Sequence, residues 1–333
     1  MDAKKGISRR RFLGGSLTLA GLGLFSAWQW NNEFANTAQA QAEDSTANSE
    51  DSGTRLILLG TNGGPRPNPT RSSPAQVILA NGVPYVVDCG SGVARQLVSA
   101  GVDLRDLAYL FITHQHSDHN LDYGNLIYEA WVSGLTTRVD AYGPSPLEQM
   151  TESYLELNEY DIETRIDDES RVPLATLIQA QEISEDGLVM EDENVKVTSA
   201  LVEHPPVEPS FAFRFDAADR SIVISGDTNY SESLIELAQG ADVLVHEALY
   251  EPGVEELVSG VPNAETLYEH IVNSHTTAED AGTVAAEAGV GTLVLSHFVP
   301  GAGSGAVSDE VWQQEAEKNF DGEVIVGEDL MEI

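Results

Sequence analysis

His114-Gln115-His116-Ser117-Asp118-His119 is the stretch of the chain that decides its fold. Three imidazoles and one carboxylate fall directly behind the apolar segment 107–112. Neutral imidazole and carboxylate are the groups that zinc and similar ions bind. A lone histidine is usually a structural residue, but a turn that crowds four such side chains has little structural use. The stretch therefore predicts a metal site at the end of a buried strand.

Short apolar segments rich in β-branched residues alternate with helical segments along the rest of the chain. The pattern predicts strands at 55–59, 76–79, 85–87, 107–112, 195–202, 211–215, 221–224, 243–245 and 292–295, and helices at 92–100, 121–132, 231–239 and 278–288. Residues 144–194 are more polar, and we expect a helical excursion there. Strands of both kinds with helices between them predict a layered α/β sandwich.

Other polar residues follow predicted strands in the same way as His114. Strand ends are rigid and can project side chains into one shared cleft, which a metal site requires. These residues are His204 after 195–202, Asp227 after 221–224, His246 and Glu247 after 243–245, and His297 after 292–295. We therefore expect five strands to deliver side chains to one site. The lone Cys89 excludes an internal disulfide, and it leaves a site of nitrogen and oxygen ligands unless Cys89 itself joins.

The start of the chain has the pattern of an export signal. Residues 8–13, Ser-Arg-Arg-Arg-Phe-Leu, match the twin-arginine motif, and the apolar run 14–28 that follows is too short for a comfortable membrane span. We expect a signal peptide over 1–42, cleaved after 38–40 or 40–42, with an uncleaved anchor as the alternative. Residues 43–53 predict a disordered acidic linker, and 54–333 one hydrolase domain. The expected location is periplasmic or extracellular, with no stable membrane span after cleavage.

Charge narrows the set of partners. The formal net charge is -37, and only Lys196 and Lys318 remain as lysines after residue 42. Such a surface is typical of proteins adapted to high salt, where self-repulsion is screened, although an ordinary acidic periplasmic protein is the alternative. Long nucleic acids need many Lys and Arg contacts to phosphate. A nucleic-acid partner is therefore disfavoured.

The chain resembles the metallo-β-lactamase superfamily, and within it the branch of ribonuclease Z, phosphodiesterases and metal-dependent arylsulfatases. The resemblance covers residues 54–333 and is carried by six motifs, at 86–90, 113–122, 225–228, 246–248, 275–278 and 296–298. It implies a four-layer αββα sandwich. It also implies two divalent metal ions, most often Zn²⁺, with Mn²⁺ or Fe as alternatives, and a hydroxide bridging them as the nucleophile. Members of this family are commonly homodimers.

The family's metal ligands carry over onto seven positions of this sequence. The first ion would be held by His114, His116 and His204, the second by Asp118, His119 and His297, and Asp227 would bridge both. Asp118 would also orient the nucleophilic water or accept its proton. Two alternatives stay open: Asp227 as a helix N-cap only, and His204 as a loop residue only.

Glu247 and His275 resemble the pair that sets up a general acid in ribonuclease Z relatives. The carboxylate would hold the imidazole protonated, so that it can give a proton to a departing alkoxide. The alternative is that both residues only brace the metal ligands. We expect Asp88 to brace a ligand, Cys89 and His246 to be buried, and His270 to lie at the surface.

These features predict an exported hydrolase of small phosphodiesters or aryl sulfate esters. The alternatives are a ribonuclease Z-like 3′-tRNA endonuclease, a lactonase, and a metal-binding protein without turnover. The long arm with which ribonuclease Z grips tRNA often lies between the motifs equivalent to His204 and Asp227. Here residues 205–226 read as a simple hairpin, which leaves no room for such an arm.

Overall fold

The computed structural model describes residues 53–301 and 305–333. The expected signal peptide, its cleavage sites and nearly all of the acidic linker lie outside the described residues. No helix among the residues described is both long enough and apolar enough to cross a membrane.

Two β-sheets and their covering helices make up the described chain. The strands are β1 Arg55–Gly60, β2 Ala75–Ala80, β3 Val83–Val87, β4 Tyr109–Phe111, β5 Val139–Gly143, β6 Ile178–Glu182, β7 Gly187–Glu191, β8 Val195–Val202, β9 Ser210–Ala217, β10 Ser221–Ile224, β11 Val243–Leu249, β12 Thr292–Val299 and β13 Glu323–Val326. The helices are α2 Val93–Ser99, α3 Ser117–Asn120, α4 Tyr123–Val132, α5 Leu147–Leu157, α6 Glu159–Glu169, α7 Glu232–Leu237, α8 Glu251–Val258, α9 Ala264–Ser274, α10 Ala278–Ala288 and α11 Asp309–Ala316, with 3₁₀ turns at Leu104–Asp106 and Leu174–Thr176.

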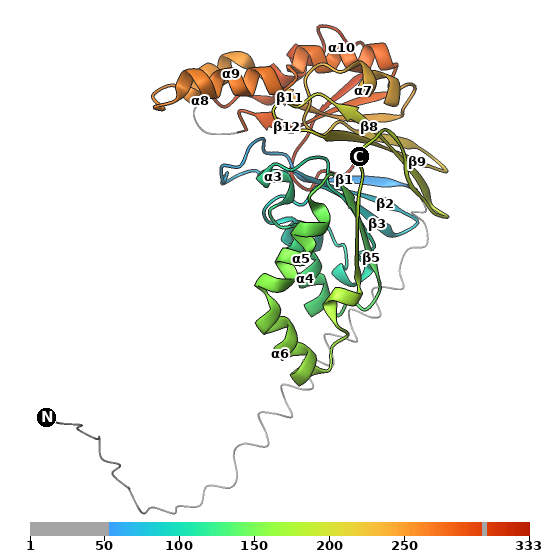
Figure 1. The fold of residues 1–333 in the computed structure, drawn as a ribbon. Coiled ribbons are helices and arrows are strands. Elements are labelled where there is room, and N and C mark those ends of the chain that lie inside the picture. Colours follow the sequence, from blue (N-terminus) through green and yellow to red (C-terminus); the bar gives the residue numbers. More distant parts are fainter. Residues whose placement is uncertain (1–52, 302–304) are drawn as a thin grey trace, which may run out of the picture. The chain divides into compact units, whose positions relative to one another are not determined.

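The elements stack as four layers, helices–sheet–sheet–helices (Figure 1). One sheet has the order β1-β2-β3-β4-β5-β6, and the other has the order β13-β12-β11-β10-β9-β8-β7. Helices α2 and α4 share a core with the outer face of the first sheet. Helices α7, α10 and α11 share one with the outer face of the second. The predicted αββα sandwich is confirmed.

The two sheets are joined by a core of aromatic and β-branched side chains. Phe111 of β4 is fully buried, and its ring centroid lies 5.5 Å from that of Phe213 and 5.2 Å from that of Phe215 on β9. Both contacts are edge-to-face, the arrangement that aromatic pairs favour. Because strand side chains alternate between faces, the neighbours of these residues point to the helix layers instead.

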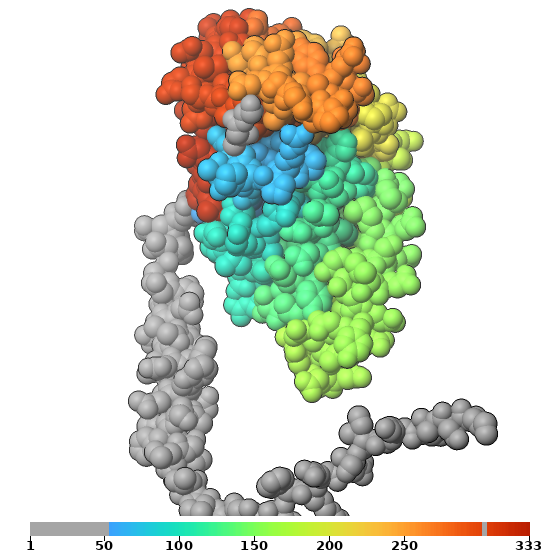
Figure 2. Space-filling view, turned by 90° about the vertical axis from the view of Figure 1, so that its left-hand side faces the viewer, coloured from blue at the N-terminus to red at the C-terminus, as the bar shows by residue number. Residues whose placement is uncertain are grey.

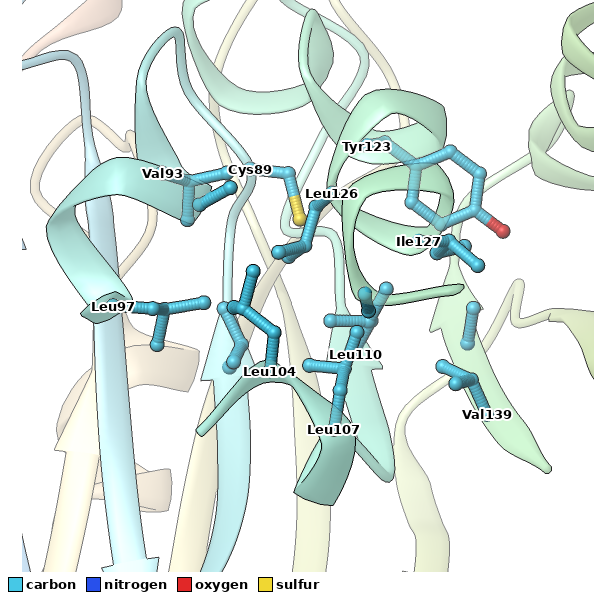
Figure 3. Close-up of a cluster of buried hydrophobic side chains, with 14 of the residues drawn as sticks. Cys89, Val93, Leu97, Leu104, Leu107, Leu110, Tyr123, Leu126, Ile127 and Val139 are labelled. Atoms are coloured by element: carbon cyan, nitrogen blue, oxygen red, sulfur yellow. The ribbon is translucent and has the colours of Figure 1, made fainter. Parts of the chain in front are cut away.

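The outer core of the first sheet contains Cys89. Its side chain is fully buried among Val93, Leu126 and their neighbours, beneath helices α2 and α4 (Figure 3). Burial raises the pKa of the Cys89 thiol well above its ordinary value. The residue is therefore a small, unreactive core side chain, as the sequence suggested.

Strand direction explains why the polar residues gather. Strands β10, β11, β12 and β13 are mutually parallel, and β8 runs the same way because it is antiparallel to β9, which is antiparallel to β10. In the other sheet β3 to β6 are parallel. The carboxyl ends of parallel strands share one sheet edge, which is where open α/β sheets bind ligands.

Two of the sequence predictions need correction. Strands β11 and β12 continue past the predicted ends at 245 and 295, so Glu247 and His297 lie inside strands rather than after them. The segment 144–194 holds helices α5 and α6 but also strands β6 and β7, so it is not only a helical excursion. β6 and β7 are edge strands of the two sheets, and polar residues such as Gln179 and Glu191 obscure the alternation of apolar and polar residues that would have predicted them.

The outer edge of β1 is covered by residues 330–333. The amide of Leu56 donates to the Ile333 carbonyl at 3.2 Å, and the amide of Ile333 donates back to Leu56 at 2.9 Å. Leu58 and Leu330 make a further bond of this kind. An unpaired strand edge is a site for aggregation, and this antiparallel segment removes it.

Replacing Phe111 with Ala should lower the free energy of unfolding by about 3–5 kcal/mol, because it empties the space between the sheets. Chemical denaturation followed by circular dichroism, at fixed salt, measures this. Leu157→Ala is the control, since that side chain is 81% exposed and should change stability by less than about 0.5 kcal/mol. Equal effects of the two changes would contradict the assigned inter-sheet core.

Candidate metal centre

The histidine turn is held from below by one carboxylate. Asp88 follows β3 in a left-handed conformation with φ of 63°, and its Oδ1 accepts the amide of Thr113 at 2.9 Å. Its Oδ2 lies 2.7 Å from Nδ1 of His119. This bond leaves Nε2 of His119 as the free ring nitrogen. Asp88 therefore orients a candidate ligand, as a bracing carboxylate commonly does.

The first candidate ligand group joins three imidazoles from both sheets. Nδ1 of His116 lies 3.1 Å from Nε2 of His114 and 3.0 Å from Nε2 of His204. His204 is fixed from behind, because its Nδ1 lies 2.7 Å from the Ser274 carbonyl oxygen. Three ring nitrogens thus face a common point.

The second group lies beside the first and is joined to it by Asp227. Oδ2 of Asp227 is 3.3 Å from Nε2 of His119 and 3.2 Å from Nε2 of His297. The same oxygen is 3.7 Å from Nε2 of His114. Asp118 completes this group, with its Oδ2 at 3.5 Å from Nε2 of His297. All seven expected side chains therefore converge, and Asp227 stands between the two groups.

Gly226 sets the position of Asp227. It has φ of 61°, and a Cβ at this residue would lie 2.7 Å from the carbonyl oxygen of Phe211. Only glycine accepts both the left-handed backbone and the close approach. The turn after β10 therefore depends on the Gly-Asp sequence, which points the carboxylate into the site.

A β-bulge sets the position of His297. Glu247 pairs with Ser296 and Ala248 pairs with Phe298, so His297 is the extra residue of β12. Its φ is 44°, an uncommon value for a residue that is not glycine. Bulges re-aim side chains next to functional sites, and this one turns His297 toward Asp118 and Asp227. The sequence offered no signal for the bulge.

The charges of the site differ from one imidazole to the next. Burial opposes protonation of His119, but the charges of the surrounding carboxylates, Asp227 first, raise its pKa well above the ordinary value. Burial lowers the pKa of His114 well below its ordinary value and that of His204 to about 4. Burial opposes ionisation of Asp118, but the charge of His119 and the proximity of His297 outweigh it and lower the pKa to about 2. Neutral imidazole and ionised carboxylate are the forms that bind metal ions.

Several ligand atoms of the site have no hydrogen-bond partner among the described residues, and this makes the set of side chains suitable for divalent metal ions. Nε2 of His119, Nε2 of His297 and Oδ1 of Asp227 are buried and have no hydrogen-bond partner among the described residues. Unpaired buried polar atoms are costly, and each of these faces the ligand groups. Asp118 and Asp227 also bury negative charge that a cation would offset. Imidazole and carboxylate together suit zinc, manganese or iron.

Glu247 and His275 form a pair at the edge of the ligand groups. Oε2 of Glu247 lies 2.7 Å from Nδ1 of His275, and Oε1 accepts the amide of Thr228 at 2.7 Å. Burial, reinforced by the charge of Asp227, raises the pKa of Glu247 well above its ordinary value, while burial lowers that of His275. The hydrogen bond holds the His275 ring with Nδ1 toward Glu247. Nε2 of His275 is left to face the cavity, which His275 lines.

The two remaining histidines differ in their surroundings. His246 is buried, its Nδ1 lies 2.8 Å from the Glu247 carbonyl oxygen, and it belongs to neither ligand group. His270 is exposed, as expected for a surface residue, but it also lines the cavity. Its ring centroid is 6.4 Å from that of His116. Sequence reasoning missed this position because α9, which carries His270, was not predicted.

A cavity of about 730 Å³ opens onto the ligand groups. Its floor includes His116, Asp118, Asp227 and His297, and its walls come from the loop 62–69 and from α8 and α9. In Figure 2 the blue segment that contains this loop lies directly beneath the orange helices. A cavity of this size suits a small-molecule ligand.

Comparison with known proteins agrees with the fold. Residues 85–298 match the family model described as Beta-lactamase superfamily domain. The chain is 34% identical over 278 residues to "Ribonuclease Z" of Mycobacterium avium (strain 104), covering 83% of this chain and 96% of that protein. The metallo-beta-lactamase fold protein YhfI of Bacillus subtilis superposes with a TM-score of 0.62 at 21% identity, covering 84% of this chain and 98% of that one. Human tRNase Z, short form, superposes with a TM-score of 0.61 at 22% identity, with the same two coverages.

Replacing Asp227 with Asn should reduce bound metal from about two ions per chain to one or none, because both ligand groups lose their shared anion. His116→Ala should remove about one ion. Plasma emission spectrometry after dialysis against zinc measures both. The control is Asp168→Asn, which removes one negative charge from an exposed position on α6. This variant should bind as much metal as the wild type. An Asp227→Asn protein with its full metal content would contradict the bridging position.

Proposed function

Because this chain belongs to the beta-lactamase superfamily and is a relative of ribonuclease Z, we propose that it is a metal-dependent hydrolase of small phosphodiesters, with aryl sulfate esters as a second substrate class. His114, His116 and His204 would hold one ion, Asp118, His119 and His297 a second, and Asp227 both. When bound, such ions polarise the ester and lower the pKa of a water toward neutrality. The family typically uses divalent ions such as zinc.

One observation supports an anionic ester as the substrate. The chain holds 54 Asp and Glu residues, yet Asp118 and Asp227 are the only carboxylates that line the cavity among the described residues. Both are candidate metal ligands, so their charge would be offset by the ions. The cavity would then be the positive region of a strongly acidic protein. Such a site favours phosphate and sulfate esters over neutral substrates.

The other residues that line the cavity favour an ester whose leaving group is an apolar alcohol. Leu257, Leu267 and Ile271 of α8 and α9 line one side, and Val299 and Pro300 continue that surface. An aryl or alkyl leaving group would bury apolar area against them. No Phe, Tyr or Trp lines the cavity among the described residues, so stacked bases would find no aromatic partner.

Glu247 and His275 would handle the leaving group's proton. Glu247 is buried and fixed by its bond from Thr228, so it can orient His275 at 2.7 Å. The opposite ring nitrogen of His275 would donate a proton to the departing oxygen. Asp118 would orient the attacking water.

We also propose that the protein acts outside the cytoplasm. The twin-arginine motif at 8–13 supports export, and the net charge of -37 supports a salty environment, where dense surface charge is screened.

A 3′-tRNA endonuclease is the second candidate, because the similarity to "Ribonuclease Z" covers 83% of this chain. That similarity weakens the expectation that nucleic acid is no substrate. Against it, residues 205–226 contain only β9, β10 and their short connections, so no arm projects between His204 and Asp227. A lactonase remains a further alternative within the same chemistry.

A substrate panel tests the proposal. Zinc-loaded protein should hydrolyse bis(p-nitrophenyl) phosphate, more slowly p-nitrophenyl sulfate, and neither a chromogenic lactone nor a 3′-extended tRNA precursor. His116→Ala should reduce the rate at least a hundredfold. Cleavage of the tRNA precursor with no turnover of the small esters would replace the first candidate with the second. No turnover of any substrate, with full metal content and matched salt, would indicate a metal-binding protein.

The role of His275 has its own test. His275→Asn should slow hydrolysis of phosphodiesters with a phenyl leaving group by about 10²- to 10⁴-fold, and p-nitrophenyl esters much less, because the better leaving group needs no proton. Glu247→Gln should show the same trend with a smaller loss. If both residues only brace the metal ligands, the loss will be equal for the two leaving groups and bound metal will fall. Steady-state rates and metal content together decide between these outcomes.

A further inference from the structure

One arginine lines the cavity without taking part in the site described above. Arg66 lies in the loop 62–69, and it is the only Lys or Arg among the described residues that line the cavity. It is exposed, at the rim rather than the floor. The floor belongs to the candidate metal ligands, so Arg66 meets a bound molecule at a different point.

The loop that carries Arg66 is held rigidly. Nδ2 of the buried Asn62 donates to the carbonyl oxygens of Gly63, Gly64 and Arg66 at 3.2, 3.2 and 3.4 Å. Its Oδ1 accepts Nδ2 of Asn68 at 2.7 Å. Prolines on both sides of Arg66 further restrict the backbone. The backbone position from which the Arg66 side chain starts is therefore set before any ligand binds.

The guanidinium of Arg66 has no hydrogen-bond or ion-pair partner among the described residues, unlike those of most arginines in this chain. Most of the other arginines are engaged: Arg71, five residues on, donates to Thr61 at 2.7 Å and lies over the Phe298 ring at 4.5 Å. Only Arg66, Arg95 and Lys196 lack an ion pair or side-chain hydrogen bond to another described residue. In a chain with 54 acidic residues, an unpaired guanidinium on a backbone-fixed loop at a cavity indicates an anionic ligand.

We propose that Arg66 is a specificity residue that binds a second anionic group of the substrate, a phosphate or carboxylate separate from the ester being cleaved. The proposal rests on the proposed function. The ions held by the metal ligands would bind the oxygens of the reacting ester at the floor of the cavity. Arg66 at the rim is therefore not needed to bind that ester. The planar guanidinium fork matches phosphate and carboxylate oxygens in pairs. The preferred substrate is therefore an ester with at least two anionic groups.

A matched pair of chromogenic substrates tests this. Thymidine 5′-(p-nitrophenyl phosphate) and its 3′-phosphorylated form differ only in the second anionic group. We expect kcat/KM for the 3′-phosphorylated substrate to be about tenfold higher, and Arg66→Gln to abolish this difference while changing the other substrate less than about twofold. Arg66→Lys should keep part of the preference, because it retains the charge but not the fork.

Arg95→Gln is the matched control, since it removes one exposed and unpaired guanidinium from α2, away from the cavity. It should retain the preference. Calorimetric titration of zinc-loaded protein with thymidine 3′,5′-bisphosphate supplies a second readout, with about tenfold weaker binding expected for Arg66→Gln alone. Equal rates on both substrates in the wild type, or an equal loss on both in Arg66→Gln, would overturn the inference. No hydrolysis of either substrate would instead count against the proposed function.

Discussion

The cost of burying Asp227 is the constraint on which the site depends. Its carboxylate is almost fully enclosed, with Nε2 of His119 and Nε2 of His297 at 3.3 and 3.2 Å from the same oxygen, while its other oxygen has no hydrogen-bond partner among the described residues. A buried charge is tolerated only when it is paired or coordinates a metal. The opposing histidines lower the pKa of Asp227 well below its ordinary value despite burial, so it stays ionised. A cation among these groups would satisfy all of them at once.

The charged side chains of the site gather in one place because the strands that carry them run in the same direction. Parallel strands in both sheets end at a common edge, so residues far apart in sequence, such as His119 and His297, become neighbours. The aromatic core around Phe111 fixes one sheet against the other. Small deviations then aim the side chains: the left-handed turn at Gly226 and the bulge at His297. The core supplies rigidity, and the irregular positions supply direction.

Much of the fold could be predicted, because apolar segments such as 221–224 and 195–202 match their strands residue for residue. The convergence of the site was predictable from the dense histidine turn and from polar residues that follow strands. The bulge at His297 was not, since it arises from pairing between β11 and β12 and leaves no local pattern. Helices α8 and α9 were also missed, and with them the cavity wall and His270. Those helices pack a separate small cluster around Val254 and Val258 and belong to neither of the two outer cores.

The antiparallel segment at 330–333 has a consequence for how the first sheet is completed. It supplies the outer partner of β1, so residues more than 270 positions apart in the sequence close this sheet together. Without that segment β1 would present an unsatisfied backbone edge next to completed strands. The first sheet is therefore complete only when both ends of the described domain are present, because β1 has its outer backbone partner in residues 330–333.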